Sequence, residues 1–357
     1  MKYKLPLLIG LPILLTAQAC TFSGIPGLGG GSTQGGILKS IDNGETWEQA
    51  NRLDAENNFV VNTVDFDTDP NDENNLYLAA GERGLFASKN KAETWAQILS
   101  GALIASIVVN RQNSDELLAG GSVNSLAKLF HSQDQGKTWV EVYSESNTGS
   151  YVSAVDIDPG NADRIVIALS TGAVLESANK GVSWGFVANL EGRILDLDFI
   201  SESPGVAYAL SISKGLYRST NSGRSWNLIS NSITEANRSV KYTDYAQTTL
   251  NSSLVYLATN TGLFRSLNSG TTWQNLRLPT HEAEGRVQSD RPTISAVTVG
   301  YENARLVYAT VGRIFYKSVD GGTTWQTNTL PFAAYVREIT QDPEEKNIIY
   351  TALGQPL

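Results

Sequence analysis

Four arginines recur at corresponding places in the second half of the chain, each near the start of a run of alternating apolar and polar residues. They are Arg193, Arg238, Arg291 and Arg337, and Lys241 lies beside the second. Guanidinium groups bind carboxylates through paired hydrogen bonds, so such a group favours capture of a carboxylate or an acidic protein segment. The alternative is pairing with nearby acids, for which Asp196, Asp244, Asp290 and Glu338 are available.

The longest segment between strand-like runs extends from Leu276 to Pro292 and is rich in charged residues. Its polar members include His281, Glu282, Glu284, Arg286 and Asp290. Long loops in compact domains are often functional, so we select His281, Glu282 and Arg286 as candidate partner-binding residues. One histidine beside two acids is weak support for a metal, and we predict no metal site and no cofactor. The alternative is an acidic surface loop.

Acidic residues also alternate within several strand-like runs. Examples are Asp65, Asp67 and Asp69, then Asp156 with Asp158, and Asp196 with Asp198. Paired carboxylates could bind calcium or perform glycosidase chemistry. Because the arrangement recurs in several parts of the chain, we interpret it as architectural and assign no catalytic residue.

The composition excludes several functions. The 357 residues carry a net charge of −9, with 27 basic and 36 acidic residues. Nucleic-acid binding requires a basic surface, so we expect none. Cys20 is the one cysteine, which excludes an intrachain disulfide and a cysteine-based metal site.

The N-terminus has the layout of an export signal. Lys2 and Lys4 precede a short apolar run, and small residues precede Cys20. The run is too short to cross a bilayer as a helix. With a cysteine at the cleavage point it resembles a bacterial lipoprotein signal, although Ala17 replaces the usual leucine. The alternative is ordinary cleavage and a free thiol.

This resemblance implies a signal peptide over residues 1–19 and a lipidated Cys20 that begins a Gly/Ser-rich tether over residues 20–35. The tether spans at most about 50 Å when extended. The protein would be exported and held at a bacterial membrane, on the periplasmic side, at the outer membrane or on the cell surface.

The elements that must position these residues are repeats. An eight-residue motif, S-x-[DN]-x-[GA]-x-[ST]-W, occurs seven times and contains all seven tryptophans, which are 42 to 52 residues apart. The third and eighth residues of the copies are Asp42 and Trp47, Asn90 and Trp95, Asp134 and Trp139, Asn179 and Trp184, Asn221 and Trp226, Asn268 and Trp273, and Asp320 and Trp325.

The motif describes a stapled turn. Asp or Asn at the third position can accept turn N–H groups, glycine at the fifth permits a positive φ, and tryptophan packs between neighbouring units. The motif is therefore structural, and Trp226→Ala should cost about 3–5 kcal/mol if Trp226 is buried between units. The second copy has Ala92 in place of glycine, so we expect that turn to be the most distorted.

The motif resembles the Asp-box, or BNR repeat, and the resemblance covers residues 36 to 353. The Asp-box family includes sialidases, xyloglucanases, sortilin-type receptors and photosystem II assembly factors. The resemblance implies a propeller with the motif turns at the outer edge of one face. Long connections would lie on the other face, which normally carries function.

Between motifs the chain alternates apolar and polar residues in short runs separated by turn signals, such as Val152–Ile157. This pattern predicts four antiparallel strands per repeat and an all-β fold. The first motif opens the domain as half a blade, and two strands without a motif end it. Residues 36–357 are therefore predicted to form one seven-bladed β-propeller, monomeric, with the last blade shared by both termini.

Two classes of function remain. Hydrolysis is disfavoured because the Arg-Ile-Pro segment typical of sialidases is absent, and because xyloglucanases use two facing propellers. The phrase at Gly215–Ser219 and Gly262–Ser266 does resemble xyloglucanases. We predict a membrane-tethered, non-catalytic propeller that binds a protein partner or acidic peptide, in an assembly or scaffold role. Glycan binding or glycoside hydrolysis is the alternative.

Overall fold

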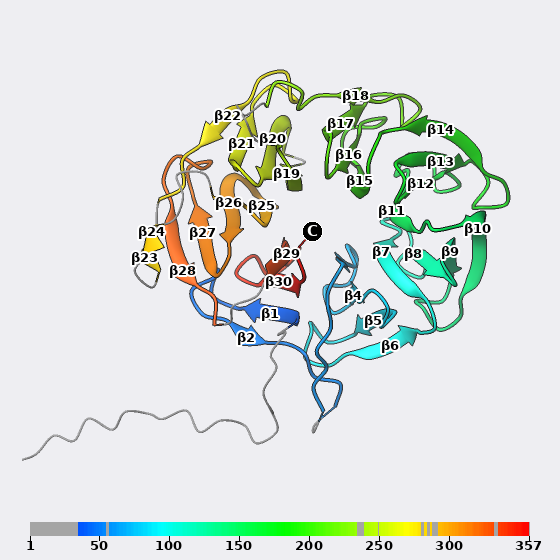
Figure 1. The fold of residues 1–357 in the computed structure, drawn as a ribbon. Coiled ribbons are helices and arrows are strands. Elements are labelled where there is room, and N and C mark those ends of the chain that lie inside the picture. Colours follow the sequence, from blue (N-terminus) through cyan, green and yellow to red (C-terminus); the bar gives the residue numbers. More distant parts are fainter. Residues whose placement is uncertain are drawn as a thin grey trace, which may run out of the picture. The chain divides into compact units, whose positions relative to one another are not determined.

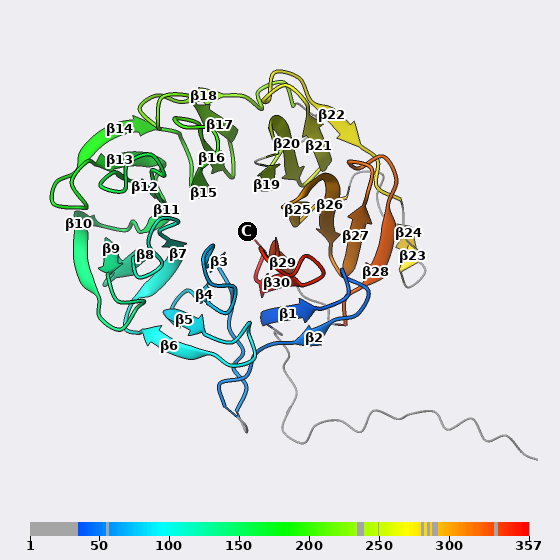
Figure 2. The same ribbon diagram turned by 180° about the vertical axis from the view of Figure 1, so that it is seen from behind.

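The computed structural model describes residues 35–54, 57–233, 239–248, 250–279, 282–283, 286–287, 292–331 and 335–356. They form seven four-stranded antiparallel sheets arranged in a ring, which is a seven-bladed β-propeller (Figure 1). The view from behind shows the same ring with its inner strands nearest the centre (Figure 2). No helix in the described part of the chain is long and apolar enough to cross a bilayer.

We number the blades along the chain. Blade 1 consists of β3 (Asp65–Thr68), β4 (Leu76–Ala79), β5 (Leu85–Ser88) and β6 (Ala96–Leu99). Blade 2 consists of β7 (Leu103–Val109), β8 (Leu117–Val123), β9 (Leu126–Ser132) and β10 (Val140–Thr148). Blade 3 consists of β11 (Val152–Ile157), β12 (Ile165–Leu169), β13 (Ala173–Ser177) and β14 (Gly185–Asn189). Blade 4 consists of β15 (Ile194–Phe199), β16 (Ala207–Ser211), β17 (Gly215–Ser219) and β18 (Asn227–Leu228).

Blade 5 consists of β19 (Tyr242–Thr248), β20 (Asn251–Thr259), β21 (Gly262–Ser266) and β22 (Gln274–Leu276). A small hairpin of β23 (Glu282–Ala283) and β24 (Arg286–Val287) follows. Blade 6 consists of β25 (Ala296–Gly300), β26 (Asn303–Val311), β27 (Ile314–Ser318) and β28 (Gln326–Thr329). Blade 7 consists of β29 (Tyr335–Gln341), β30 (Ile349–Gly354), β1 (Gly36–Ser40) and β2 (Glu48–Gln49).

The seventh blade joins the two ends of the domain, as the sequence predicted. Its strand order is β2-β1-β30-β29, and β1 pairs antiparallel with β30, with Leu38 opposite Thr351. Both strands are almost fully buried. The pairing removes the two exposed sheet edges that an open ring would leave.

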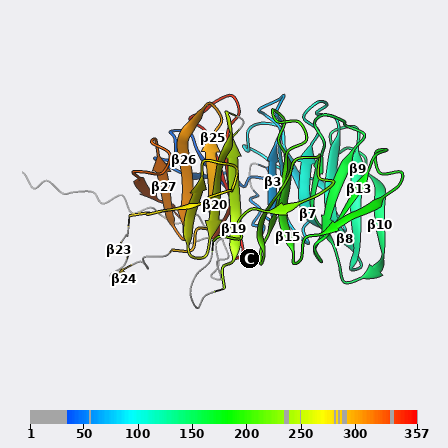
Figure 3. The same ribbon diagram turned by 90° about the horizontal axis from the view of Figure 1, so that it is seen from above.

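Each blade runs from an inner strand at the channel to an outer strand at the rim, and its strands run between two faces of the ring (Figure 3). The turn after the inner strand packs beside the motif turn of the same blade, as shown by the bond from the Lys91 N–H to the Asn74 carbonyl. We call this the motif face. The connections between blades and the hairpins between second and third strands lie on the opposite face, which we call the mouth face.

The seven motifs form one kind of turn. In every copy the first serine Oγ accepts the backbone N–H of the fifth residue at 2.8 or 2.9 Å. The third residue, Asp or Asn, accepts the N–H of the seventh at 2.8 or 2.9 Å. These bonds hold the pKa of Asp42 and Asp134 down at about 2, with the Thr46 and Thr138 hydroxyls as the largest causes.

The expected distortion at Ala92 is wrong. Ala92 adopts φ 65°, and its N–H still reaches the Ser88 Oγ at 2.9 Å. In five other copies a Cβ on the glycine would lie 2.4 to 2.8 Å from a large side chain of the preceding blade, namely Ile98, Val142, Ile229, Leu276 or Phe315. The first four of these side chains belong to the third residue after the tryptophan of their blade. In the blade before Ala92, the third residue after the tryptophan is Ala50. The small Ala50 therefore makes room for the methyl group.

The tryptophans join neighbouring blades to different degrees. Trp95 is 2 % exposed, and its indole N–H donates to the Ala50 carbonyl at 2.8 Å. Trp139, Trp184 and Trp273 are half-buried and donate to the same place in the blade before them. Trp226 is also half-buried, and its indole N–H has no partner among the described residues. The sequence-based cost of about 3–5 kcal/mol for Trp226→Ala assumed that Trp226 is buried. The structure does not meet that condition.

Candidate functional site

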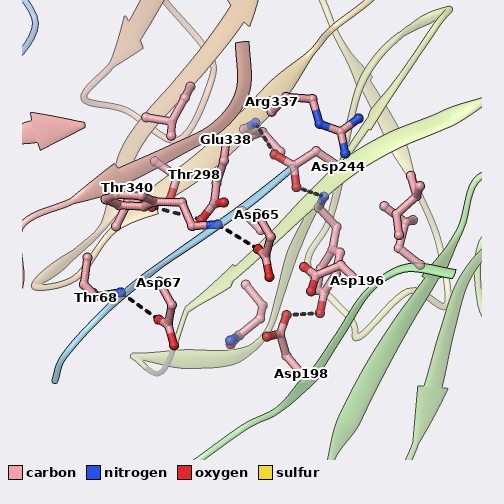
Figure 4. Close-up of a pocket in the computed structure, with 18 of the residues that line it drawn as sticks. Asp65, Asp67, Thr68, Asp196, Asp198, Asp244, Thr298, Arg337, Glu338 and Thr340 are labelled. Atoms are coloured by element: carbon pink, nitrogen blue, oxygen red, sulfur yellow. Dashed lines mark hydrogen bonds between the residues drawn. The ribbon is translucent and has the colours of Figure 1, made fainter. Parts of the chain in front are cut away.

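The central channel is lined with carboxylates. The inner strands place seven of them on a cavity of about 300 Å³. Figure 4 shows that several point toward one another from different blades. The seven are Asp65, Asp67, Asp156, Asp196, Asp198, Asp244 and Glu338. The same wall carries Arg111 and Arg337. The acidic alternation found in the sequence therefore faces the channel, except that Asp69 and Asp158 accept N–H groups of their own turns instead.

Several of these carboxylates tie one blade to the next. One oxygen of Asp65 accepts the Ile107 N–H at 2.8 Å, and Asp67 accepts the Val109 N–H at 2.8 Å. Corresponding bonds run from the Phe199 N–H to Asp156 at 2.6 Å and from the Val297 N–H to Asp244 at 2.8 Å. Each bond crosses to the inner strand of the following blade. The geometry agrees with an architectural role for these acids.

The channel raises the pKa of several of these carboxyl groups. Burial raises the pKa of Asp65 to about 6, of Asp67 and Asp244 to about 7, and of Asp156 to about 8. Burial, together with neighbouring carboxylates, also puts the pKa of Asp196 and Glu338 well above the ordinary range. Carboxyl groups in this state can donate protons near neutral pH, as catalytic acids do. The described residues contain no cluster of metal-ligating side chains suited to hold a metal ion.

A second cavity, which we call the mouth pocket, opens at the mouth face. Its volume is about 530 Å³. Its walls include the connection between blades 7 and 1, the hairpin between β4 and β5 of blade 1, and β7. Val60, which is 47 % exposed, and Leu103 supply apolar surface. Val64 and Arg337 line both the mouth pocket and the channel cavity, so the two cavities adjoin.

The mouth pocket contains three arginines, Arg83, Arg193 and Arg337, and one acid, Glu82. Arg193 donates to the Tyr151 hydroxyl at 3.4 Å, and Arg337 donates to the Val64 carbonyl at 3.4 Å. Neither guanidinium forms an ion pair within the described residues. Burial and, more weakly, the positive charge of Arg193 lower the pKa of Arg337.

The structure thus brings two of the four predicted arginines to one pocket. Asp196, Asp244 and Glu338, the acids that could have paired with them, face the channel. Asp244 interacts electrostatically with Arg337 there but forms no ion pair with it. Arg83 was missed from the sequence, although its place in a hairpin of the mouth face could be found by counting strands. Lys241 is exposed and is not part of the pocket lining.

The other selected residues are not tested. Arg238, Arg291, His281, Glu284, Asp290 and Cys20 lie outside the described residues. Glu282 belongs to β23 and Arg286 to β24, where only the backbone pairing of Glu282 with Val287 and Ala283 with Arg286 is described.

Comparisons with known proteins place the fold. No protein-family model and no curated protein sequence matches the chain. Among solved structures, the GH74 xyloglucanase from Xanthomonas campestris is similar with a TM-score of 0.66 and 17 % identity, over 82 % of this chain and 51 % of that one. The chain thus spans about half the length of that xyloglucanase.

YCF48 bound to a D1 peptide is similar with a TM-score of 0.60 and 16 % identity, over 83 % of this chain and 94 % of that one. The RRP9 WD40 repeats give a TM-score of 0.59 at 11 % identity, over 83 % and 96 % of the two chains. The fold therefore defines a seven-bladed β-propeller with an acidic channel and an arginine-lined mouth. Its structural neighbours include glycoside hydrolases as well as non-enzymatic propellers.

Proposed function

We propose that this protein is a membrane-tethered, non-catalytic propeller that captures a carboxylate-bearing segment of a partner protein in the mouth pocket. The observation that carries the proposal is the pair Arg193 and Arg337, which line one pocket without an ion-pair partner among the described residues. Placing two partly buried cations side by side is costly unless an anion compensates them. A carboxylate is the ligand that guanidinium groups hold with two parallel hydrogen bonds.

The shape of the mouth pocket suits a peptide. Apolar wall residues such as Val60 and Leu103 lie beside the arginines, so a side chain next to the carboxylate can bury apolar surface while the carboxylate is held. Binding sites commonly combine apolar walls with a few convergent polar groups. A propeller of nearly the same length, YCF48, has been solved with a bound peptide, which supports peptide binding by this kind of fold.

The tether is compatible with this arrangement. The chain enters β1 at Gly36, opposite Leu353 near the end of β30, and this end of both strands belongs to the mouth face. A lipid on Cys20 would hold the mouth face within about 50 Å of a membrane. The partner would then be a membrane protein, or a protein delivered to a membrane, with an acidic exposed segment.

Glycan binding or glycoside hydrolysis is the second candidate, in keeping with the xyloglucanase neighbours. One observation favours it. The channel places several carboxyl groups with raised pKa close together, including Asp156 at about 8 and Asp244 at about 7. Against it, Asp156 and Asp244 already accept backbone N–H groups of the next blade.

The test is cross-linking of the full protein in its membrane, followed by purification and mass spectrometry. Arg193→Gln should abolish capture of a defined partner, because it removes a charge from the mouth pocket. The matched control is Arg305→Gln, because Arg305 is an exposed arginine at the start of β26 on the motif face. Equal capture by both variants would refute the proposal. Turnover of a glycoside that is lost in Asp244→Asn would favour the second candidate.

A further inference from the structure

Blade 7 differs from the other six at the mouth face. In blades 1 to 6 a continuous hairpin joins the second strand to the third, as between β4 and β5. In blade 7 this hairpin is replaced by two separate segments, because β30 ends at Gly354 and β1 begins at Gly36. The chain continues beyond β30 toward the centre of the ring, where Figure 1 marks the C-terminus.

The path of this segment is fixed by close backbone contacts. The Thr63 N–H donates to the Leu353 carbonyl at 3.0 Å. A Cβ on Gly354 would lie 2.4 Å from the Thr63 carbonyl oxygen and 2.6 Å from Cγ of Arg337. Only glycine fits between these groups. The chain therefore leaves β30 pressed between the connection that precedes β3 and the Arg337 side chain.

Residues 355–356, which we call the C-terminal strap, then line the mouth pocket with Arg193 and Arg337. Within the part of the chain that the structure describes, the strap is held by one hydrogen bond, from the Gln355 N–H to the Asn62 Oδ1 at 2.5 Å. Both Gln355 and Pro356 are exposed. A segment with one anchoring bond and no buried side chain is cheap to displace.

From this geometry we infer that the C-terminal strap is an autoinhibitory element: it occupies part of the mouth pocket, and a carboxylate-bearing segment must displace it to reach Arg193 and Arg337. The inference rests on the proposed function of the pocket. Breaking the single anchor removes one competing interaction, so ligand affinity should rise by about three- to tenfold, the net worth of one hydrogen bond.

Three variants of the full protein test this. The first ends at Gly354 and lacks the strap. The second, Gln355→Pro, removes the N–H donor of the anchor and leaves Asn62 unchanged. The third, Gln355→Ala, is the matched control because it keeps the N–H. The probe is a fluorescein-labelled tetraglutamate peptide with a free C-terminal carboxylate, and binding is measured by fluorescence anisotropy at low salt.

Removal of the strap and Gln355→Pro should each tighten binding about three- to tenfold, while Gln355→Ala stays within about twofold of the unchanged protein. Equal affinity of all four proteins would overturn the strap and leave the proposed function standing. Absence of binding in all four proteins, including the one without the strap, would overturn both. Loss of binding on removal of the strap would show that the strap forms part of the ligand site, and would also overturn the inference.

Discussion

The pair Ala50 and Ala92 allows a sharp test of how neighbouring blades fit together. The six other motif copies have glycine as their fifth residue, and in five of them a large side chain of the preceding blade occupies the space that a Cβ would need. Ala50→Ile would place such a side chain against the methyl group of Ala92, which is 1 % exposed. Overpacking of this kind typically costs about 1–3 kcal/mol.

Ala92→Gly alone should change the free energy of unfolding little. Removing the buried methyl costs about 0.8 kcal/mol, and glycine costs roughly 0.5–1 kcal/mol in backbone entropy. Glycine adopts the φ of 65° found at this position without the steric strain that alanine has there, and this stabilises the folded state by about 1–2 kcal/mol. Together, the two changes recreate the pairing of a large residue with glycine that other blades use.

The double variant should therefore recover most of the loss caused by Ala50→Ile. The cycle is measured by urea unfolding of the two single variants and the double variant, followed by tryptophan fluorescence. We expect a favourable coupling free energy of about 1–3 kcal/mol. A coupling below about 0.5 kcal/mol would show that Ala50 does not make room for Ala92, and the explanation of the undistorted turn would fail.

Two further predictions concern stability. Trp95→Ala should lower the free energy of unfolding by about 3–5 kcal/mol because Trp95 is buried and hydrogen-bonded. Trp226→Ala should lower the free energy of unfolding clearly less because Trp226 is half-buried. Equal losses of the two variants in urea unfolding would contradict this prediction. The raised pKa values of Asp65, Asp67, Asp156 and Asp244, about 6 to 8, mean that the folded state keeps protons which the unfolded chain releases near pH 4. Stability from these groups is thus greatest below pH 4 and declines as pH rises to about 8. In thermal unfolding, the melting temperature should fall from pH 5 to pH 8, and it should fall less steeply in Asp156→Asn. If the melting temperature of that variant fell as steeply as that of the unchanged protein, this would count against titration of Asp156.

Much of the fold was readable from the sequence because the motif repeats at a regular spacing. Seven tryptophans and two unmatched end strands were enough to predict seven blades and the shared seventh blade. The turn at Ala92 was not predictable in the same way. Its geometry depends on Ala50, 42 residues earlier, and the contact between them becomes apparent only when the register of adjacent blades is known.

The candidate site was only partly predictable for the same reason. Arg193 and Arg337 could be placed near the mouth because each precedes or begins an inner strand. Asp65 accepts an N–H group from β7, and Asp244 accepts one from β25. These partners depend on how far each blade is rotated against the next. Sequence periodicity gives the face of a strand that a residue occupies, but not the backbone group opposite its side chain.

The acidic channel and the arginine-lined mouth are coupled through Arg337, which borders both cavities. Ionised Asp65 and Asp244 would attract this guanidinium toward the channel, since both carboxylates favour its charged form. Burial raises the pKa of both acids and keeps much of their population neutral below about pH 6 to 7. Raised carboxyl pKa values therefore do more than reflect a crowded channel. Below about pH 6 to 7 they leave the positive charge of Arg337 available at the mouth, as the proposed capture of an anionic segment requires.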